Sequence, residues 1–160
     1  MSIKVIIVGR YQSGKTSIVH RIKTDKFDSN NMFTASVTVS TYELQGKSFL
    51  FNDISGNETY QNAVTTLFRN AKIAIIVFNI DSLQSFYEVD KWHDKIKSLL
   101  NVQVPNDPNF VSIILVGTKC DLENRKVLFE QGEEKAESLG QSTKYIEVSS
   151  KTGQNIDILK

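Results

Sequence analysis

Eight residues near the N-terminus match a pattern that binds phosphate groups. Residues 9–16 read G-R-Y-Q-S-G-K-T, which fits G-x-x-x-x-G-K-[ST]. Backbone N–H groups of such a loop, and of the helix that follows it, point inward and surround phosphate oxygens. Lys15 would reach the β- and γ-phosphates, and the Thr16 hydroxyl is a hard oxygen ligand suited to Mg²⁺. The pattern predicts a nucleoside-phosphate site, against the alternative of a glycine-containing turn that binds nothing.

The elements around this loop have the order that the pattern requires. Residues 3–8 are short, β-branched and end at Gly9, which is typical of a buried strand leading into a glycine loop. Apolar spacing along the chain predicts strands at 3–8, 37–44, 48–54, 73–80, 111–116 and 145–148, and helices at 15–22, 85–100 and 131–139. A turn at 45–47 joins two of the strands into a hairpin. Strands alternating with helices indicate an α/β fold around a mostly parallel sheet.

Composition narrows the class of protein. The chain has 160 residues, of which 40% are hydrophobic and 23% charged, as in ordinary soluble single domains. Its 19 basic and 18 acidic residues leave a formal charge of +1, which argues against a nucleic-acid binder. One cysteine, Cys120, fits a reducing compartment. The apolar run at 5–8 is too short for a signal peptide or a membrane span, so we expect a soluble, cytoplasmic protein.

Further motifs decide among the classes of nucleotide-binding protein. They are Thr34, eighteen residues after Thr16, then D-I-S-G-N-E at 53–58, T-K-C-D at 118–121 and S-S-K at 149–151. With these motifs in this order, the sequence resembles the Ras superfamily of small GTPases, and within it the Rab family most closely. The likeness extends from K-V-I-I-V-G at 4–9 to E-V-S-S-K-T-G at 147–153. L-F-R-N-A at 67–71 and D-S-L-Q-S-F at 81–86, followed by Trp92, resemble Rab segments that pack in the interior.

The resemblance implies a fold and a phosphate-side role for several residues. The fold is a P-loop NTPase G domain over residues 1–160: a six-stranded, mostly parallel sheet with one antiparallel hairpin and helices on both faces, its last helix cut short. Thr34 would ligate Mg²⁺ and sense the γ-phosphate, although it could be an ordinary loop threonine. Asp53 would hold Mg²⁺ through water, and the Gly56 N–H would bond the γ-phosphate; a D-x-x-G string is weak evidence by itself.

The same resemblance implies a site that reads guanine. T-K-C-D looks like the base-reading N-K-x-D motif, in which the carboxylate of Asp121 accepts hydrogen bonds from the N1–H and the amino group of guanine. Adenine lacks this pair of donors and would leave a buried carboxylate unsatisfied. The Lys119 stem would pack along the base, and a backbone N–H of S-S-K would contact guanine O6. Phe27 falls where the family places an aromatic ring at the base edge. A charged loop without a ligand is the alternative.

Two departures from the family pattern predict slow GTP hydrolysis. The family orients the attacking water with a glutamine after D-x-x-G, where this chain has Asn57. Asparagine is one methylene shorter, so its amide falls short by about 1.5 Å, and a misplacement of that size can cost on the order of 10²-fold in rate. Tyr11 and Gln12 stand where relatives have small residues. Tyr11 would crowd the γ-phosphate, swing outward, or touch the γ-phosphate with its hydroxyl, and the sequence leaves all three open.

Other departures concern partners. Thr118 replaces an asparagine whose amide ties neighbouring loops together, and a hydroxyl offers fewer bonds. Asn52 and Val39 replace a tryptophan and a phenylalanine that Rab effectors read, so the usual effectors are not expected. The chain stops at Lys160, before the tail and prenylated cysteines of the family. A membrane would be reached only through such a tail.

The sequence therefore predicts a Rab-like GTP/GDP switch in vesicle trafficking, at the cytosolic face of endomembranes, that uses Mg²⁺ and meets effector, exchange-factor and activating proteins. The alternative is a nucleotide-binding scaffold with negligible turnover. Residues assigned to the nucleotide are Gly9, Tyr11, Gln12, Ser13, Gly14, Lys15, Thr16, Ser17, Phe27, Thr34, Gly56, Thr118, Lys119, Asp121, Ser149, Ser150 and Lys151. Those assigned to Mg²⁺ are Thr16, Thr34 and Asp53, and those assigned to hydrolysis are Lys15, Thr34, Gly56 and Asn57.

Overall fold

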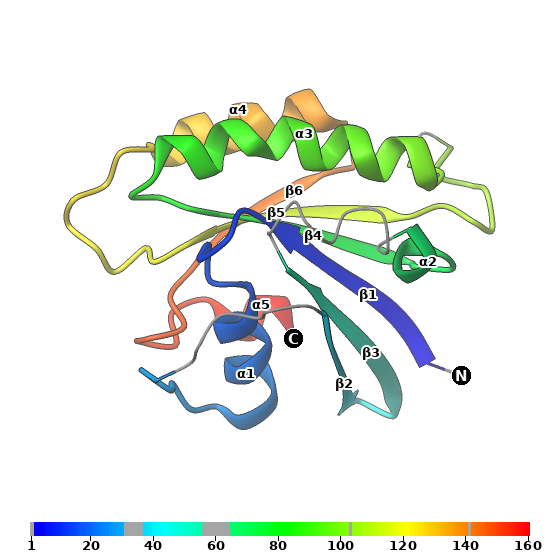
Figure 1. Cartoon of the computed structure of the whole chain (residues 1–160), viewed down its shortest axis with the longest axis horizontal. Helices are drawn as coiled ribbons and strands as arrows, with labels where there is room; N and C mark the ends of the chain where they lie inside the picture. The colour runs from blue at the N-terminus through cyan, green and yellow to red at the C-terminus, as the bar shows by residue number, and fades with distance from the viewer. Residues whose placement is uncertain (1, 31–36, 56–64, 103, 141) are drawn as a thin grey trace.

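Six strands form one sheet in the order β2-β3-β1-β4-β5-β6 (Figure 1). The computed structural model describes residues 2–30, 37–55, 65–102, 104–140 and 142–160. Along the chain the elements are β1 (Ser2–Gly9), α1 (Lys15–Thr24), β2 (Val37–Leu44), β3 (Lys47–Ile54), α2 (Thr65–Phe68), β4 (Ile73–Asn79), α3 (Leu83–Leu99), β5 (Ser112–Thr118), α4 (Phe129–Leu139), β6 (Lys144–Val148) and α5 (Ile156–Leu159).

The pairing of the strands confirms the predicted fold class. β1 pairs in parallel with β3 and β4, and β5 pairs in parallel with β4 and β6. Only β2 and β3 are antiparallel among the strand pairs described. Their turn consists of Gln45 and Gly46, whose φ angles of 50° and 74° are those of a two-residue hairpin turn that matches strand twist.

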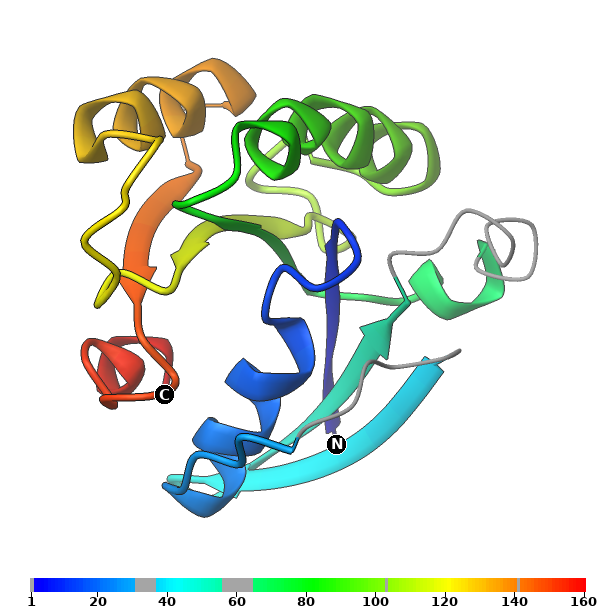
Figure 2. The ribbon, with the colours of Figure 1, turned by 60° about the vertical axis from the view of Figure 1, so that its left-hand side comes forward.

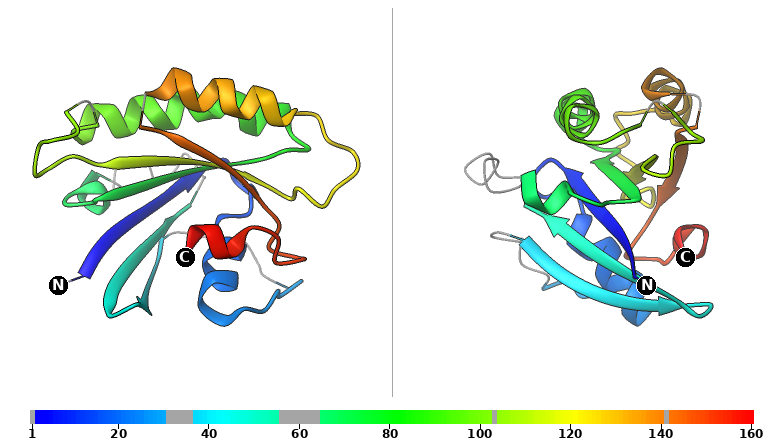
Figure 3. Two further views of the ribbon diagram at one scale, coloured as in Figure 1. Left: turned by 180° about the vertical axis from the view of Figure 1, so that it is seen from behind. Right: turned by 90° about the vertical axis from the view of Figure 1, so that its right-hand side faces the viewer.

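Helices cover both faces of the sheet, which explains the continuous apolar runs in the central strands. α3 and α4 lie on one face, and α1 and α5 on the other (Figure 3). Successive side chains of a strand point to opposite faces. Ile6 therefore packs in the core under α3 and α4, whereas its neighbours Val5 and Ile7 pack in the core under α1. Each central strand needs apolar residues at nearly every position.

Most predicted elements are confirmed, with differences at their ends. α3 begins at Leu83, two residues before the prediction, because the Ser82 hydroxyl accepts a hydrogen bond from the Ser85 N–H and caps the helix. α4 begins at Phe129, where the Gln131 side chain accepts from the Leu128 N–H at 2.8 Å.

The aromatic residues of the segments that resemble Rab packing segments lie in the core. Phe68, Phe86 and Trp92 are 0%, 8% and 4% exposed. The short helix α2, which ends at Phe68, was not predicted. Within the described parts of the chain, no helix has the length and apolar character needed to cross a membrane.

Candidate functional site

The predicted site residues gather at the carboxyl ends of the parallel strands. The loop after β1 leads into α1 at this edge of the sheet (Figure 2). Asp53 lies near the end of β3, Thr118 ends β5, and Ser149 follows β6. Because parallel strands end at the same edge, these residues from distant parts of the sequence meet there, where open α/β sheets bind ligands.

Two glycines give the loop after β1 its shape. Gly9 has a φ of 150°, and a Cβ atom there would lie 2.2 Å from the backbone oxygen of Val77. Gly14 has a φ of 98° and precedes α1. Between them the Ser13 N–H donates to the Arg10 carbonyl at 3.1 Å and closes a turn. The loop therefore depends on glycine at the two positions that the motif fixes.

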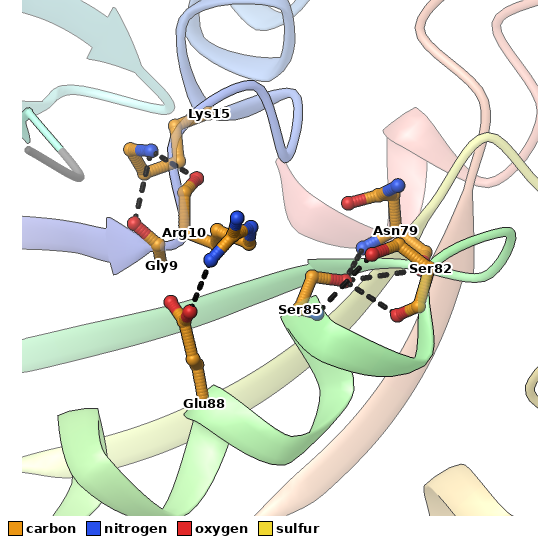
Figure 4. Close-up of polar contacts among 7 residues, drawn as sticks. All are labelled: Gly9, Arg10, Lys15, Asn79, Ser82, Ser85 and Glu88. Atoms are coloured by element: carbon orange, nitrogen blue, oxygen red, sulfur yellow. Dashed lines mark hydrogen bonds and ion pairs between the residues drawn. The ribbon is translucent and has the colours of Figure 1, made fainter.

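Lys15 carries a buried positive charge into this loop. Lys15 is only 5% exposed. Its Nζ donates to the carbonyls of Gly9 at 3.1 Å and Arg10 at 2.9 Å (Figure 4). Burial lowers the pKa of Lys15 to about 8, and the nearby carboxylates of Asp53 and Glu88 oppose that shift. A cation enclosed by a loop of this shape suits phosphate oxygens.

Thr16 and Asp53 bring two hard oxygen donors together beside Lys15. The Thr16 hydroxyl donates to the Asp53 carboxylate across 2.5 Å, and Asp53 is 2% exposed. Proteins commonly hold Mg²⁺ with one or two such side chains together with phosphate oxygens and water. The donor set therefore fits Mg²⁺. Ser17 follows in the first turn of α1 and is partly buried.

Three predicted residues lie outside the described parts of the chain: Thr34, Gly56 and Asn57. Their assignments to the γ-phosphate, to Mg²⁺ and to the attacking water stay predictions. The Tyr11 side chain is described, and the residue is 39% exposed. The loop therefore does not enclose this ring, and Gln12 beside it has a left-handed backbone with a φ of 61°.

The loops after β5 and β6 are joined through Asp121 and Ser149. The Ser149 hydroxyl donates to the Asp121 carboxylate at 2.6 Å and accepts from the Thr152 N–H at 3.1 Å. The Cys120 N–H donates to the Val148 carbonyl at 3.2 Å, so the backbones are joined as well. A carboxylate in this position can accept hydrogen bonds from a ligand with paired N–H donors.

The remaining residues assigned to the base flank this pair. Lys119 has a left-handed φ of 62°, which turns the chain between Thr118 and Asp121. Ser150 is partly buried, and Lys151 is exposed. Phe27, after α1, is 42% exposed.

Thr118 connects the two halves of the site. Its hydroxyl lies 2.6 Å from the Ser13 carbonyl and 3.2 Å from the Phe78 carbonyl. A hydroxyl has one hydrogen to donate, and the shorter distance is to Ser13 in the phosphate loop. We expected a threonine to tie the loops less well than an asparagine; the structure nevertheless contains a direct bond from the end of β5 to the phosphate loop.

Sequence reasoning missed an ionic network behind Asp121 and Ser149. Arg125 binds both carboxylate oxygens of Glu147, each at 2.7 Å, and the Tyr145 hydroxyl donates to Glu147 at 2.8 Å. Glu147 is 7% exposed. The pKa of Arg125 is raised by its hydrogen bonds to Glu147. The sequence carried little signal of this network, because a glutamate between Ile146 and Val148 is also typical of the solvated face of an edge strand.

The Tyr145 ring is wedged between β5 and α4. A Cβ atom at Gly132 in α4 would lie 2.1 Å from the ring, and one at Gly117 in β5 would lie 2.6 Å from its hydroxyl. Burial is the main cause that raises the pKa of this hydroxyl, followed by its hydrogen bond to Glu147. The two glycines thus leave room for a side chain that supports Glu147.

A second missed contact joins the phosphate loop to α3. The Arg10 guanidinium forms an ion pair with the Glu88 carboxylate (Figure 4). The residues are 78 positions apart in the sequence, and nothing local to either one predicts the pair.

Comparison with known families supports the broader of the two resemblances. A family model described as the Ras family matches residues 4–159. The match includes the phosphate loop, T-K-C-D at 118–121 and S-S-K at 149–151.

Proposed function

This chain belongs to the Ras family of small GTPases, and we propose that within the family it acts as a Rab-like GTP/GDP switch with slow intrinsic hydrolysis. Binding of guanine nucleotides, generally with Mg²⁺, is a property of the family. The observation that carries the proposal is the arrangement along one sheet edge. Lys15 and the Thr16–Asp53 pair lie at the phosphate loop, and the Asp121–Ser149 pair lies beyond Thr118.

At the phosphate end of the site, we assign the charged group to the phosphates and the hard oxygen donors to Mg²⁺. Lys15 would exchange its bonds with the loop carbonyls for bonds with phosphate oxygens, and the loop N–H groups would bind the rest of the phosphate chain. Thr16 and Asp53 would hold Mg²⁺, which supplies positive charge to the phosphates. Thr34 and Gly56 are assigned to the γ-phosphate from the family resemblance. Loss of the γ-phosphate would then release the two loops that carry these residues, and this release is the switch.

At the base end we assign guanine recognition to Asp121. Ser149 already donates to one of its oxygens, which fixes the orientation of the carboxylate. A carboxylate with a fixed orientation discriminates sharply, because a base without matching donors leaves it unsatisfied. Lys119 and Phe27 would pack against the base, and Ser150 and Lys151 would approach its O6 edge.

We infer that the trafficking role is Rab-like but that the partners are not the usual Rab effectors. Asn52 is 3% exposed and its side-chain amide donates to the Leu67 carbonyl at 3.3 Å, so it anchors α2 and offers no aromatic surface. Val39, its register partner in β2, is 56% exposed but small. Effector, exchange-factor and activating proteins would therefore read a different surface, at the cytosolic face of endomembranes.

The alternative is a scaffold that binds nucleotide and turns over negligibly. Two features favour it. Asn57 is shorter than the glutamine that orients water, and Tyr11 places a large, 39% exposed side chain on the phosphate loop.

Single-turnover hydrolysis of GTP separates the switch from the scaffold. If the short side chain of Asn57 is the main cause of slow hydrolysis, Asn57→Gln should raise the hydrolysis rate by about tenfold or more, which corresponds to a barrier lower by about 1.4 kcal/mol. If crowding dominates, the added change Tyr11→Gly should be required, and the two effects should be non-additive. Rates that stay at the parent value in both variants would favour the scaffold. A parent as fast as typical relatives would refute slow hydrolysis.

A further inference from the structure

Arg10 links the phosphate loop to α3, because its carbonyl accepts hydrogen bonds within the loop and its side chain pairs with the helix. Its carbonyl accepts from the Lys15 Nζ at 2.9 Å and from the Ser13 N–H at 3.1 Å. Its side chain leaves the loop in another direction and pairs with Glu88 of α3 (Figure 4). Movement of Arg10 would therefore displace a single carbonyl that both closes the turn with Ser13 and orients Lys15.

Glu88 is presented by a firmly anchored part of α3. The Ser85 hydroxyl accepts from the Asn79 N–H at 3.0 Å, which joins the end of β4 to the first turn of the helix. Ser82 caps that turn by accepting from the Ser85 N–H at 3.2 Å. Ser85 is 1% exposed, and Val89, next to Glu88, is fully buried. The helix start cannot shift without breaking these contacts, so the backbone that carries Glu88 has a defined position.

We propose that Glu88 is a positioning residue for nucleotide binding, which acts through Arg10 to hold the phosphate loop in its binding conformation. The inference rests on the proposed guanine-nucleotide site. The Arg10–Glu88 pair ties the phosphate loop to α3, and through Ser85 to β4, whereas the glycines of the motif only shape the loop itself. The pair is partly exposed, with 35% of the Arg10 side chain and 27% of the Glu88 side chain accessible, so its contribution is modest.

A purely electrostatic effect of Arg10 and Glu88 on the phosphates would give changes of opposite sign when one or the other residue is neutralised. If Arg10 and Glu88 acted only through their fields, loss of the cation would weaken the binding of an anionic phosphate, and loss of the anion would strengthen it. If they act by positioning, loss of either partner frees the loop in the same way. The sign of the effect therefore distinguishes the two mechanisms.

The experiment measures release of a fluorescent GDP analogue from the parent, Arg10→Gln, Glu88→Gln and the double variant, each in excess GDP with Mg²⁺. Both single changes should accelerate release by roughly two- to fivefold. The double variant should release the GDP analogue at about the same rate as each single variant, because all three lose the same contact. Asp90→Asn is the matched control. It removes a carboxylate two residues along the same helix whose partner is Lys135 of α4, at 2.7 Å, and should leave release unchanged.

Several results would overturn the proposal. Slower release in Glu88→Gln with faster release in Arg10→Gln would show a field effect, and unchanged release in both would show no role. Should Glu88→Gln fail to fold, Glu88→Asp keeps the charge but withdraws it by one methylene. Faster release there supports positioning, and release at the parent rate contradicts it. A parent that does not bind the GDP analogue would refute the guanine-nucleotide site itself.

Discussion

Glu147→Gln tests the buried network behind the base-reading loops. In the parent, both carboxylate oxygens of Glu147 accept from Arg125 at 2.7 Å, and Tyr145 donates to one of them. Glutamine keeps the size of the side chain and one acceptor oxygen. Its amide nitrogen is a donor and would face a donor of the guanidinium, so one of the two bonds to Arg125 is lost along with the negative charge.

The expected cost follows from the burial of the partners. A hydrogen bond to a charged group contributes roughly 1.5–3 kcal/mol. The Arg125 side chain is 27% exposed, so water compensates part of its loss. We therefore expect the free energy of unfolding to fall by about 1–2 kcal/mol. For a chain of this size that lowers Tm by roughly 2–8 °C.

Thermal unfolding followed by circular dichroism measures this change. Parent and variant are compared at one saturating concentration of GDP and Mg²⁺, because a bound ligand raises Tm by itself. Asp90→Asn again serves as the control, since Asp90 forms an ion pair with Lys135 but has 57% of its side chain exposed. Its expected loss is within about 0.5 kcal/mol. A shift for Glu147→Gln no larger than that of the control would refute the reasoning.

Two further predictions concern recognition and pH. Asp121→Asn should weaken GTP binding and favour xanthosine triphosphate, because the amide supplies a donor where xanthine has an additional carbonyl; equal GTP affinity in a competition assay would contradict the assignment. His93 has a pKa lowered below 6.5, by burial first and then by Lys97. The unfolded chain therefore binds a proton that the folded chain does not, and stability should fall as the pH drops below about 6.5. Melts from pH 7 to pH 5 should show a smaller fall for His93→Gln, and an identical fall would exclude His93 as a cause.

Local patterns in the sequence predicted most of the fold and the shape of the phosphate loop. Gly9, Gly14 and Lys15 are close in sequence, so their motif specifies both the turn and the charge. The turn predicted at 45–47, between two strand-like runs, is confirmed as a hairpin, and the positive φ angles of Gln45 and Gly46 are a local feature of such turns. α2 was missed because four residues are too few to show helical periodicity.

Contacts between distant charged residues could not be predicted in the same way. Arg10 and Glu88 each resemble an ordinary solvated side chain, and only the packing of α3 near β1 brings them together. The bond from Thr118 to Ser13 spans 105 positions and depends on how closely β5 approaches the loop. Glu147 was no exception, since the alternation Ile146-Glu147-Val148 could equally place its carboxylate in solvent, and nothing near it in the sequence identifies Arg125 as the partner.

The wedge of Tyr145 between β5 and α4 constrains how this protein can evolve. Any side chain at Gly132 would occupy the space of the ring, and any side chain at Gly117 would displace its hydroxyl. Replacing Tyr145 with a small residue would make room at Gly132, whereas Ile80 and Phe78 would still crowd a Cβ at Gly117; it would also leave a void and remove a donor from Glu147. Each single step is thus harmful, and a viable path requires changes at 145 and at a glycine together. In relatives of this chain, residues 132 and 145 should therefore vary together and seldom one at a time.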